Sequence, residues 1–493
     1  MAGKFLKFFS PFVKAMPELK QPQREVSFKE KFIWTAVVLI IYLILSSIPL
    51  YGTQMAESTD YFYWLRVILA STRGHLTELG IGPIVTAGLI MQLLLGSRII
   101  NVNMADPYDR AMFSGAQKVL AIFLTIFNAI AYILGGAFGP LSSIVDAYGV
   151  GGPFFIFFQL LFAGIIIVLL DELLQKGWGL GSGVSLFIAA GVAGQIFWHA
   201  FSFVPAADGV PTGVVIAFFS VLFDGNPDTN LGTILIRGNF PSLIGGLTTL
   251  LIFFLVIWFE STRVEIPLAY RGYRGFKGKY PMKLLYVSNI PVILVNALYA
   301  NILFFGQLLA GPTSGLRASN GGIIPDFWLN LIGVFESETA DVGSQLIPKG
   351  GLIYLLTPPL GVDQLAENPL RAVIYLVIFI FLCILLGRVW VEVSGLAPRD
   401  IASQIIDSQM QVPGFRSSGK IVERILKRYI PTLVILNGII IASLSFFADS
   451  LRALTSGTGL LITIGIVHQY AETISKELAA AQYPGMRAML GLD

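Results

Sequence analysis

The sequence predicts an all-α integral membrane protein, and three observations support this fold class. First, 55% of the 493 residues are hydrophobic and only 13% are charged. Soluble globular domains carry about 25% charged residues, so much of this surface must face lipid. Second, apolar runs long enough to cross a bilayer recur along the chain. Third, Lys and Arg concentrate in alternate segments between these runs.

The apolar runs predict ten spanning helices, each with about 20 mostly apolar residues. The first run is followed by no small-residue cleavage site, so we interpret it as a retained helix rather than a signal peptide. The tenth run is the weakest, because it contains His468, Gln469 and Glu472. The predicted spans are residues 31–49, 79–96, 114–135, 154–173, 183–201, 242–260, 287–309, 371–391, 429–447 and 457–474.

The basic residues orient these spans, because Lys and Arg favour the cytoplasmic side. They cluster before span 1, between spans 6 and 7, and between spans 8 and 9. The loop between spans 3 and 4 has no basic residue, and the loop between spans 5 and 6 has only Arg237. With ten spans, both termini are therefore predicted to be cytoplasmic. The single cysteine, Cys383, rules out an intrachain disulfide, and we predict neither a metal site nor a cofactor.

Two pairs of spans begin with similar motifs. Span 5 begins SGVSLFI (182–188) and span 10 begins SGTGLLI (456–462). Span 2 begins GIGPIV (80–85) and span 7 begins SNIPVI (288–293). The partners in each pair lie five spans apart, an odd number, so they cross the membrane in opposite directions. This pattern is typical of inverted repeats, whose transport path lies at the interface between the repeats.

The paired motifs place aliphatic side chains at matching positions, Val85 with Ile293 and Ile188 with Ile462. Two more aliphatic residues precede Val85 and Ile188 by four positions and share their helix faces. A ring of such side chains would form a hydrophobic constriction that closes a pore by dewetting. The alternative is that they face lipid or pack between helices. The predicted ring consists of Ile81, Val85, Val184, Ile188, Ile293 and Ile462.

The second span begins with helix-breaking residues, Gly80, Gly82 and Pro83. Such residues are tolerated at membrane depth where the chain borders a cavity rather than lipid. A short segment before this span, residues 60–70, has helical periodicity but is too short to cross a bilayer. It is either an interfacial helix or a half-helix folded into a cavity, in which case span 2 is broken.

Five segments resemble SecY, the family of large subunits of the Sec protein-conducting channel, in its archaeal and eukaryotic form. The resemblance extends from span 1 to span 10. The segments are LGIGPIVTAGLIMQLLLGS (79–97), RAMFSGAQKVLAI (110–122), LDELLQKGWGLGSGVSLFIAAGV (170–192), TRVEIPLAYRGYRGFKGKYPMKLLYVSNIPVIL (262–294) and VERILKRYIP (422–431).

The resemblance implies an N-terminal half, 1–240, and a C-terminal half, 241–493, around a central pore. It implies that the same six ring residues line the pore and that residues 58–72 form a plug. It also implies a lateral gate between spans 2 and 3 and spans 7 and 8. The polar cluster of this gate maps to Thr86, Gln117 and Asn301. The implied function is to pass secretory polypeptides across the membrane and to release transmembrane segments laterally into lipid.

The resemblance implies that the basic loops 262–286 and 392–428 bind a ribosome or a motor ATPase. Basic side chains suit a polyanion, so ribosomal RNA is the only nucleic acid expected here. The alternative is that these charges only orient the protein. Other implied partners are nascent polypeptides, signal sequences and two small membrane subunits of the SecE/gamma and SecG/beta types. The residues predicted to bind the ribosome or motor are Arg271, Arg274, Lys277, Lys279 and Arg416.

The implied location is an archaeal plasma membrane, or the endoplasmic reticulum membrane of a eukaryote. The external segments 201–241 and 310–371 match the family poorly, and no function is predicted for them. The alternative function is secondary transport of a small solute, which also uses inverted repeats and broken helices. That function needs convergent polar or charged groups at membrane depth, and the spans offer few. No HExxH or nucleophile motif occurs, so we do not predict an enzyme.

Overall fold

The computed structural model describes residues 4–482 except for 25, 54–70, 72, 98, 101, 103–105, 139–140, 207–208, 224–230, 238–239, 271–276, 313–316, 319–321, 323, 341–342, 408–409 and 412–418. A helix is present at each of the ten predicted spans. These helices are α2 (Phe28–Ser47), α4 (Gly82–Gly96), α5 (Pro107–Leu134), α7 (Gly151–Leu173), α8 (Gly183–Phe201), α11 (Leu243–Ser261), α12 (Ile290–Ala310), α16 (Pro369–Val393), α18 (Gly419–Ser450) and α19 (Gly457–Gln482).

Seven of these helices, namely α5, α7, α8, α11, α12, α16 and α18, are long and apolar enough to cross a membrane. Helix α4 has 15 residues, because the turns that precede it take up the start of the predicted span. Helix α18 begins at Gly419, ten residues before the predicted span, since an amphipathic segment extends it beyond the apolar run. The fold is therefore the all-α membrane fold that the composition predicts.

Short polar side chains determine where several spans begin. Ser27 Oγ accepts from Glu30 N at 3.4 Å at the start of α2. Asp106 Oδ1 accepts from Tyr108 N at 3.0 Å at the start of α5. Ser242 Oγ accepts from Gly245 N at 3.1 Å at the start of α11. Each bond satisfies an N–H group that has no partner within the helix.

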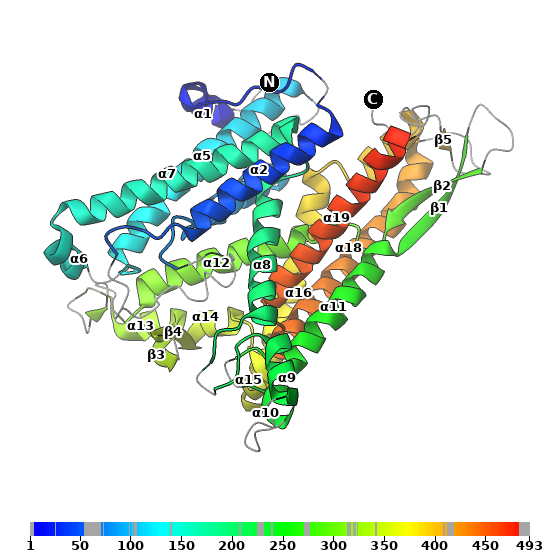
Figure 1. Ribbon diagram of the computed structural model, residues 1–493. Helices are drawn as coiled ribbons and strands as arrows, with labels where there is room; N and C mark the ends of the chain where they lie inside the picture. The colour runs from blue at the N-terminus through cyan, green and yellow to red at the C-terminus, as the bar shows by residue number, and fades with distance from the viewer. Residues whose placement is uncertain are drawn as a thin grey trace.

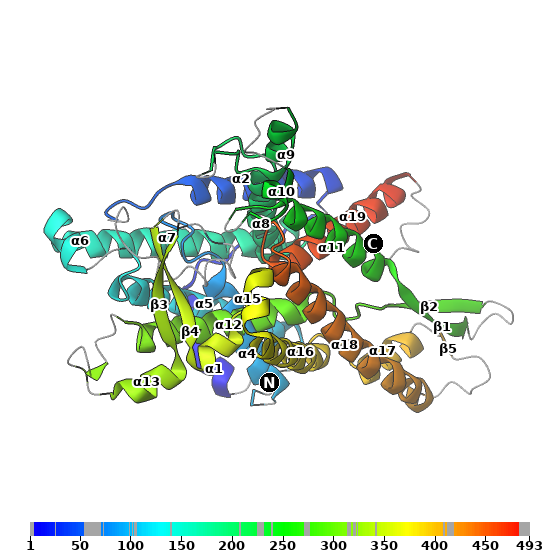
Figure 2. The ribbon, with the colours of Figure 1, turned by 90° about the horizontal axis from the view of Figure 1, so that it is seen from below.

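Helices α4, α12 and α16 contact one another (Figure 2). Helices α5 and α7 pack together on one side, and α11, α18 and α19 pack together on the other (Figure 1). Helix α8 contacts both groups, because it packs against α7 and α19. The N-terminal α1 (Lys4–Ala15) and the last turns of α19 lie toward the same end of the molecule.

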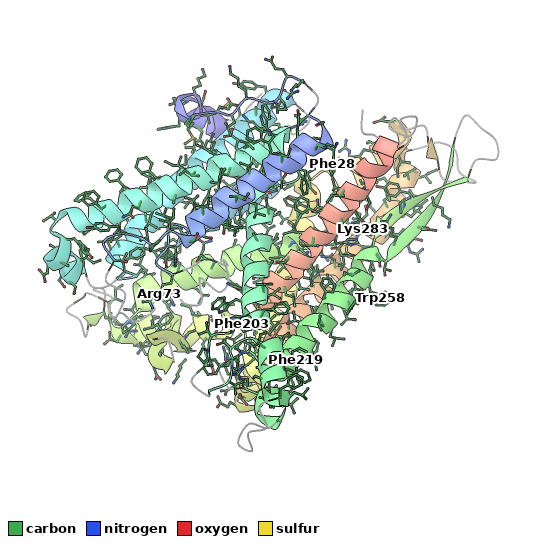
Figure 3. The ribbon with its side chains drawn as sticks, in the orientation of Figure 1. Phe28, Arg73, Phe203, Phe219, Trp258 and Lys283 are labelled. Carbon is green, nitrogen blue, oxygen red and sulfur yellow. The ribbon has the colours of Figure 1, made fainter. Side chains whose placement is uncertain are left out.

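The outward faces of the spanning helices are apolar. Trp258 on α11 is 61% exposed and points away from the protein (Figure 3). Phe219 on the short helix α9 (Val214–Phe223), which lies between two spans, is also 50% exposed (Figure 3). Exposed apolar side chains on this scale indicate contact with lipid rather than water.

The loops contain short strands, which the sequence analysis did not predict. Strands β1 (Arg263–Tyr270) and β2 (Lys277–Lys283) pair antiparallel in the register Arg263↔Lys283, and β5 (Met410–Gln411) pairs with β1 through Ala269↔Gln411. The two predicted docking loops therefore lie side by side in one sheet. In β1, the inward-facing Val264 and Ile266 alternate with exposed residues. This alternation is typical of a strand, but it is short and lies in a strongly basic loop, so it did not predict a strand from the sequence.

The remaining elements lie in the connections between spans. Helix α1 packs against α5, and a single π-helical turn, η1 (Leu174–Trp178), follows α7. The described residues of segments 201–241 and 310–371 form several short helices and strands. The further elements are α6 (Leu141–Tyr148), α10 (Leu231–Leu235), α13 (Asp326–Ile332), β3 (Val334–Ala340), β4 (Gly343–Gly350), α14 (Gly351–Leu356), α15 (Gly361–Glu367) and α17 (Pro398–Asp407).

Helices α4 and α12 begin with the same backbone geometry, as expected for repeated units. Gly80 and Ser288 both adopt positive φ, 53° and 48°. The next residues, Ile81 and Asn289, have nearly identical backbone angles, with φ of −90° and −87° and ψ of −1° and 0°. A proline occupies the first turn of each helix. The short sequence match between spans 2 and 7 therefore reflects a shared local structure.

Candidate functional site

The structure places the six predicted ring residues in one hydrophobic cluster. Ile81, Ile188 and Ile462 are 3%, 8% and 4% exposed and belong to the core of this cluster. Val85, Val184 and Ile293 are half-buried and pack against it. They come from α4, α8, α12 and α19, and contacts join these helices in the order α4, α12, α19, α8. Residues that are up to 381 positions apart in the chain, from Ile81 to Ile462, thus share one apolar environment.

The turns that lead into α4 are buried within the protein. Thr77 and Glu78 are each 1% exposed, and Glu78 accepts a hydrogen bond from the backbone of Gly74. Backbone bonds join residues 48–50 to 74–76, with Leu50 N to Gly74 O at 2.7 Å. These turns border protein rather than lipid, which explains why glycine and proline are tolerated here. Of the predicted plug segment 58–72, only residue 71 lies within the described residues.

Two of the three predicted gate residues form a hydrogen bond between helices. Asn301 Nδ2 on α12 donates to Thr86 Oγ1 on α4 at 2.9 Å, and also to Ala297 O at 2.6 Å. Gln117 on α5 lies against α4 instead, since a Cβ at Gly88 would be 3.1 Å from Gln117 Nε2. All three side chains therefore lie along α4.

Aromatic and apolar contacts also join the helix pair α4 and α5 to the helix pair α12 and α16. The rings of Phe127 on α5 and Phe305 on α12 lie 6.0 Å apart. The rings of Tyr132 and Phe304 stack at 5.6 Å. At the other end of α4, Gly96 allows close approach of α16, because a Cβ there would be 2.7 Å from Val389 Cγ1. This surface holds few polar groups, so separating it exposes mostly apolar side chains.

The predicted docking residues are only partly described. Arg271, Arg274 and Arg416 lie outside the described residues, and Lys277 is placed in β2 opposite Ala269. Lys279 has a side chain that is 69% exposed and forms an ion pair with Glu265 across the hairpin. An exposed pair of this kind contributes little to stability, so Lys279 remains accessible to an anionic partner.

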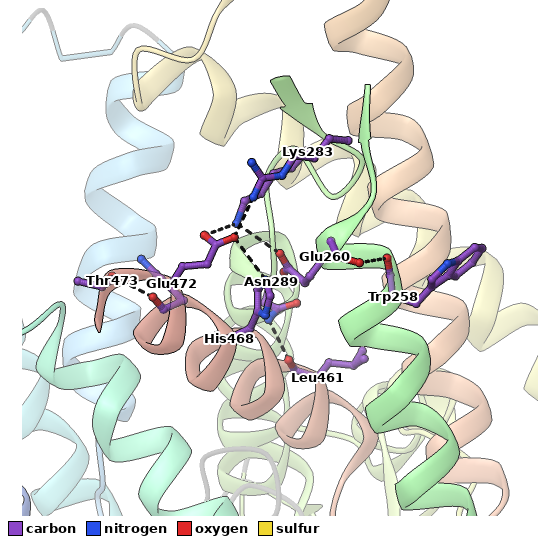
Figure 4. A network of polar contacts seen from close by, with 11 residues as sticks. Trp258, Glu260, Lys283, Asn289, Leu461, His468, Glu472 and Thr473 are labelled. Atoms are coloured by element: carbon purple, nitrogen blue, oxygen red, sulfur yellow. Dashed lines mark hydrogen bonds and ion pairs between the residues drawn. The ribbon is translucent and has the colours of Figure 1, made fainter. Parts of the chain in front are cut away.

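An ion-pair network attaches the β1–β2 hairpin to α11 and α19 (Figure 4). Lys283 Nζ, at the end of β2, donates to Glu472 Oε2 at 3.1 Å and lies 3.8 Å from Glu260 Oε2. Arg263 Nη2 donates to Glu472 Oε1 at 3.3 Å, and His468 Nε2 lies 3.4 Å from the same oxygen. Glu260 is 2% exposed, so Lys283 is needed to compensate a buried carboxylate.

The segment that follows Lys283 is also attached to α19. Asn289 Nδ2 donates to Leu461 O at 2.8 Å (Figure 4). A Cβ at Gly465 would lie only 1.8 Å from that nitrogen. Tyr286 donates to Leu396 O at 2.9 Å, and burial raises the pKa of its phenol. The β1–β2 hairpin and the segment that follows it are thus both attached to α19, which carries the predicted ring residue Ile462.

Two buried carboxylates that the sequence analysis did not single out also contact ring-bearing helices. Asp171 on α7 accepts from Val184 N at 3.0 Å, and Asp449 on α18 accepts from Gly457 N at 2.7 Å. The sequence does contain a signal for these carboxylates, because an aspartate occurs at the end of the span before each Ser-Gly motif. The partner of such an aspartate cannot be read from the motif alone.

Comparison with known proteins agrees with this geometry. The family model for SecY matches residues 75–471, and the model for the plug domain of Sec61p matches residues 40–74. A solved structure of a protein conducting channel is 36% identical, with a TM-score of 0.77, and the match covers 96% of this chain and 98% of that one. Sec61 in the canine ribosome-channel complex from the endoplasmic reticulum is 35% identical, with a TM-score of 0.74 and the same coverage.

A more distant structure has the same fold. It is the idle yeast Ssh1 complex bound to the yeast 80S ribosome, which is 26% identical with a TM-score of 0.74. The match covers 95% of this chain and 94% of that one. The similarity therefore extends over nearly the whole chain in each comparison.

Proposed function

This chain belongs to the SecY family of protein-conducting channels, and from this premise we propose how its residues form the pore, the gate and the docking surface. Membership makes it the pore-forming subunit of a membrane channel that passes secretory polypeptides and releases transmembrane segments into lipid. It also decides against the secondary transporter, whose substrate pocket would need convergent polar groups.

We propose that the six ring residues form the constriction of the pore. The observation that carries this proposal is that all six belong to one hydrophobic cluster, although they come from four helices of two halves, 1–240 and 241–493. Aliphatic side chains exclude water from a narrow passage and so block ions. They make no directional bonds, so they can move apart around a polypeptide of any sequence. Residues 58–72 act as the plug, a role supported by the match to the plug domain.

We propose that α4 and α5 separate from α12 and α16 to open the lateral gate. The bond between Thr86 and Asn301 is neutral, and such interhelical bonds in membranes contribute about 0.6 kcal/mol on average. Gln117 adds a further amide on the α5 side. A barrier this low suits a gate that an apolar signal segment must open by binding alone.

We propose that the hairpin β1–β2 and the adjoining 392–428 loop receive a ribosome or a motor ATPase on the cytoplasmic side. Relatives solved in complex with ribosomes support this partner. Both termini then lie in the cytoplasm. The channel itself lies in an archaeal plasma membrane or an endoplasmic reticulum membrane. Small subunits of the SecE/gamma and SecG/beta types complete the channel. The protein itself performs no catalysis, so the partner supplies the energy.

The constriction is tested by ion leak through the reconstituted channel. Replacing Ile188 and Ile462 together by glycine removes two aliphatic side chains from the cluster and should raise the leak. The matched control replaces Ile40 and Ile44 of α2, which are 55% and 53% exposed, so that the loss of helix propensity is the same. Unchanged conductance in the first variant, or an equal rise in the control, would contradict the constriction.

A further inference from the structure

Asp171 lies on α7 and binds the backbone at the start of the neighbouring helix α8. It is 6% exposed, and its Oδ1 accepts from Val184 N at 3.0 Å. Its Oδ2 accepts from Gln175 Nε2 at 2.8 Å, which fixes the orientation of the carboxylate. The N-cap residue of α8, Ser182, makes no side-chain capping bond. Asp171 therefore supplies the cap, and it does so at the backbone of a ring residue.

Asp449 also caps a helix start in the other half, where Ser456 Oγ accepts a second bond, from Gly459 N at 3.3 Å. Asp449 is 4% exposed, lies at the end of α18, and its Oδ1 accepts from Gly457 N at 2.7 Å. Gly457 is the first residue of α19, and Ile462 follows it within two turns. The two aspartates thus occupy equivalent places, since each lies at the end of the span that precedes the last ring-bearing helix of its own half, α8 or α19.

The glycine of each Ser-Gly motif explains how the aspartates reach these helix starts. A Cβ at Gly183 would lie 2.6 Å from Asp171 Cα, and a Cβ at Gly457 would lie 2.2 Å from Ser445 O. Only glycine permits the two helices to approach so closely. The motif that revealed the internal repeat is therefore the contact through which each aspartate caps its neighbour.

We propose that Asp171 and Asp449 are positioning residues for the pore constriction, each fixing the start of one ring-bearing helix from within its own half. The inference rests on the proposed constriction. The first N–H groups of a helix have no internal partner, and a carboxylate there also faces the positive end of the helix dipole. Loss of the carboxylate from a buried site leaves an N–H group without its partner and lets the helix start shift.

The test compares ion leak through the full channel, reconstituted with its small subunits, for alanine and asparagine variants of both aspartates. Asp171→Ala and Asp449→Ala should each raise the leak about 5- to 30-fold, the population change expected for losing one buried hydrogen bond. Asp171→Asn and Asp449→Asn keep an acceptor oxygen in place and should stay near the parent level. The proposal is overturned if alanine and asparagine variants leak equally.

Controls separate positioning of the ring from general stability. Asp106→Ala and Ser242→Ala remove caps from α5 and α11, which carry no ring residue, and should lower the melting temperature without raising the leak. If these controls leak as much as the Asp171 and Asp449 variants, the caps act only on stability and the proposal fails. In the Ile188→Gly/Ile462→Gly background the alanine variants should add little further leak.

Further variants cover the case in which the alanine proteins do not fold. Asp171→Glu and Asp449→Glu keep the charge but displace the carboxylate by one methylene, so they should leak more than the asparagine variants. Equal leak from Glu and Asn variants would reject the positioning role. If the glycine pair at Ile188 and Ile462 does not leak, the constriction itself fails and this inference fails with it. If the glycine pair leaks while the aspartate variants do not, only this inference fails.

Discussion

Thr86→Val is the most selective perturbation of the proposed gate. Valine has nearly the volume of threonine but no hydroxyl, so the 2.9 Å bond from Asn301 is lost with little change in packing. Asn301 Nδ2 keeps its bond to Ala297 O at 2.6 Å, so this nitrogen is not left without a partner. The substitution therefore removes one contact between α4 and α12 and leaves the helices otherwise intact.

The size of the effect follows from the environment of this bond. Double-mutant cycles of interhelical hydrogen bonds in membrane proteins average about 0.6 kcal/mol and reach about 1.7 kcal/mol. Thr86 is 8% exposed. The larger free energy applies where water does not replace the lost contact, and the smaller one where it does. The equilibrium between closed and open gate should shift about 3- to 20-fold toward open.

The assay measures translocation of a reporter with a shortened, weakly apolar signal segment into proteoliposomes. Thr86→Val should raise the yield of this reporter, since less binding energy is needed to part the helices, while a strong signal should be unaffected. Thr125→Val is the control, because the Thr125 hydroxyl bonds only to Ala121 O of its own helix, at 2.8 Å.

A double-mutant cycle with Asn301→Leu isolates the pair. Once Asn301 is replaced, Thr86→Val should have little further effect. Fully additive effects of the two substitutions, or an unchanged yield of the weak reporter in Thr86→Val, would refute the assignment of this bond to the gate.

Three other predictions concern the docking hairpin and its attachment. Lys283→Met should leave the buried Glu260 carboxylate uncompensated and lower the free energy of unfolding by about 1–2 kcal/mol. This value allows for the partial exposure of Lys283 to solvent. The control Lys279→Met should be nearly neutral in thermal unfolding. Gly465→Ala should displace the Asn289 side chain from α19 and speed hydrogen exchange at the start of α12, while alanine at Gly194, which has open space, should not. Replacing the three predicted loop arginines by glutamine should weaken ribosome binding and reduce its salt-dependence slope by about 2–3; an unchanged slope would show that they make no phosphate contacts.

The spanning helices could be predicted from the sequence because a bilayer requires long apolar runs. Their ends were less predictable. The apolar run that predicts α18 begins near Tyr429, yet the helix begins at Gly419. The reason is that an amphipathic helix is stable outside the membrane, where no apolar run marks its start. The hairpin β1–β2 was missed because its alternating pattern is short and contains Pro267 and Pro281.

The site was predicted only where the sequence repeats itself or resembles the family. Ile188 and Ile462 were predicted as ring residues because their motifs match, and Thr86 and Asn301 as gate residues because the family has a polar gate. Asp171 was missed, because a carboxylate that caps the following helix is recognisable only when the two helices are seen together. The network around Lys283 was missed for the same reason, since its partners come from α11 and α19.

The path of the translocating chain tests the central claim most directly. Cysteines placed at Ile81 and Ile293, in a chain whose buried Cys383 is replaced by alanine, are crosslinked to a stalled polypeptide that carries a single cysteine. Positions Leu250 and Val377, which are 56% and 60% exposed on the outer surface, serve as controls. A constriction formed by the six ring residues predicts crosslinks from Ile81 and Ile293 to the same part of the polypeptide, and none from the controls. Crosslinks that form at the controls but not at Ile81 and Ile293 would contradict it.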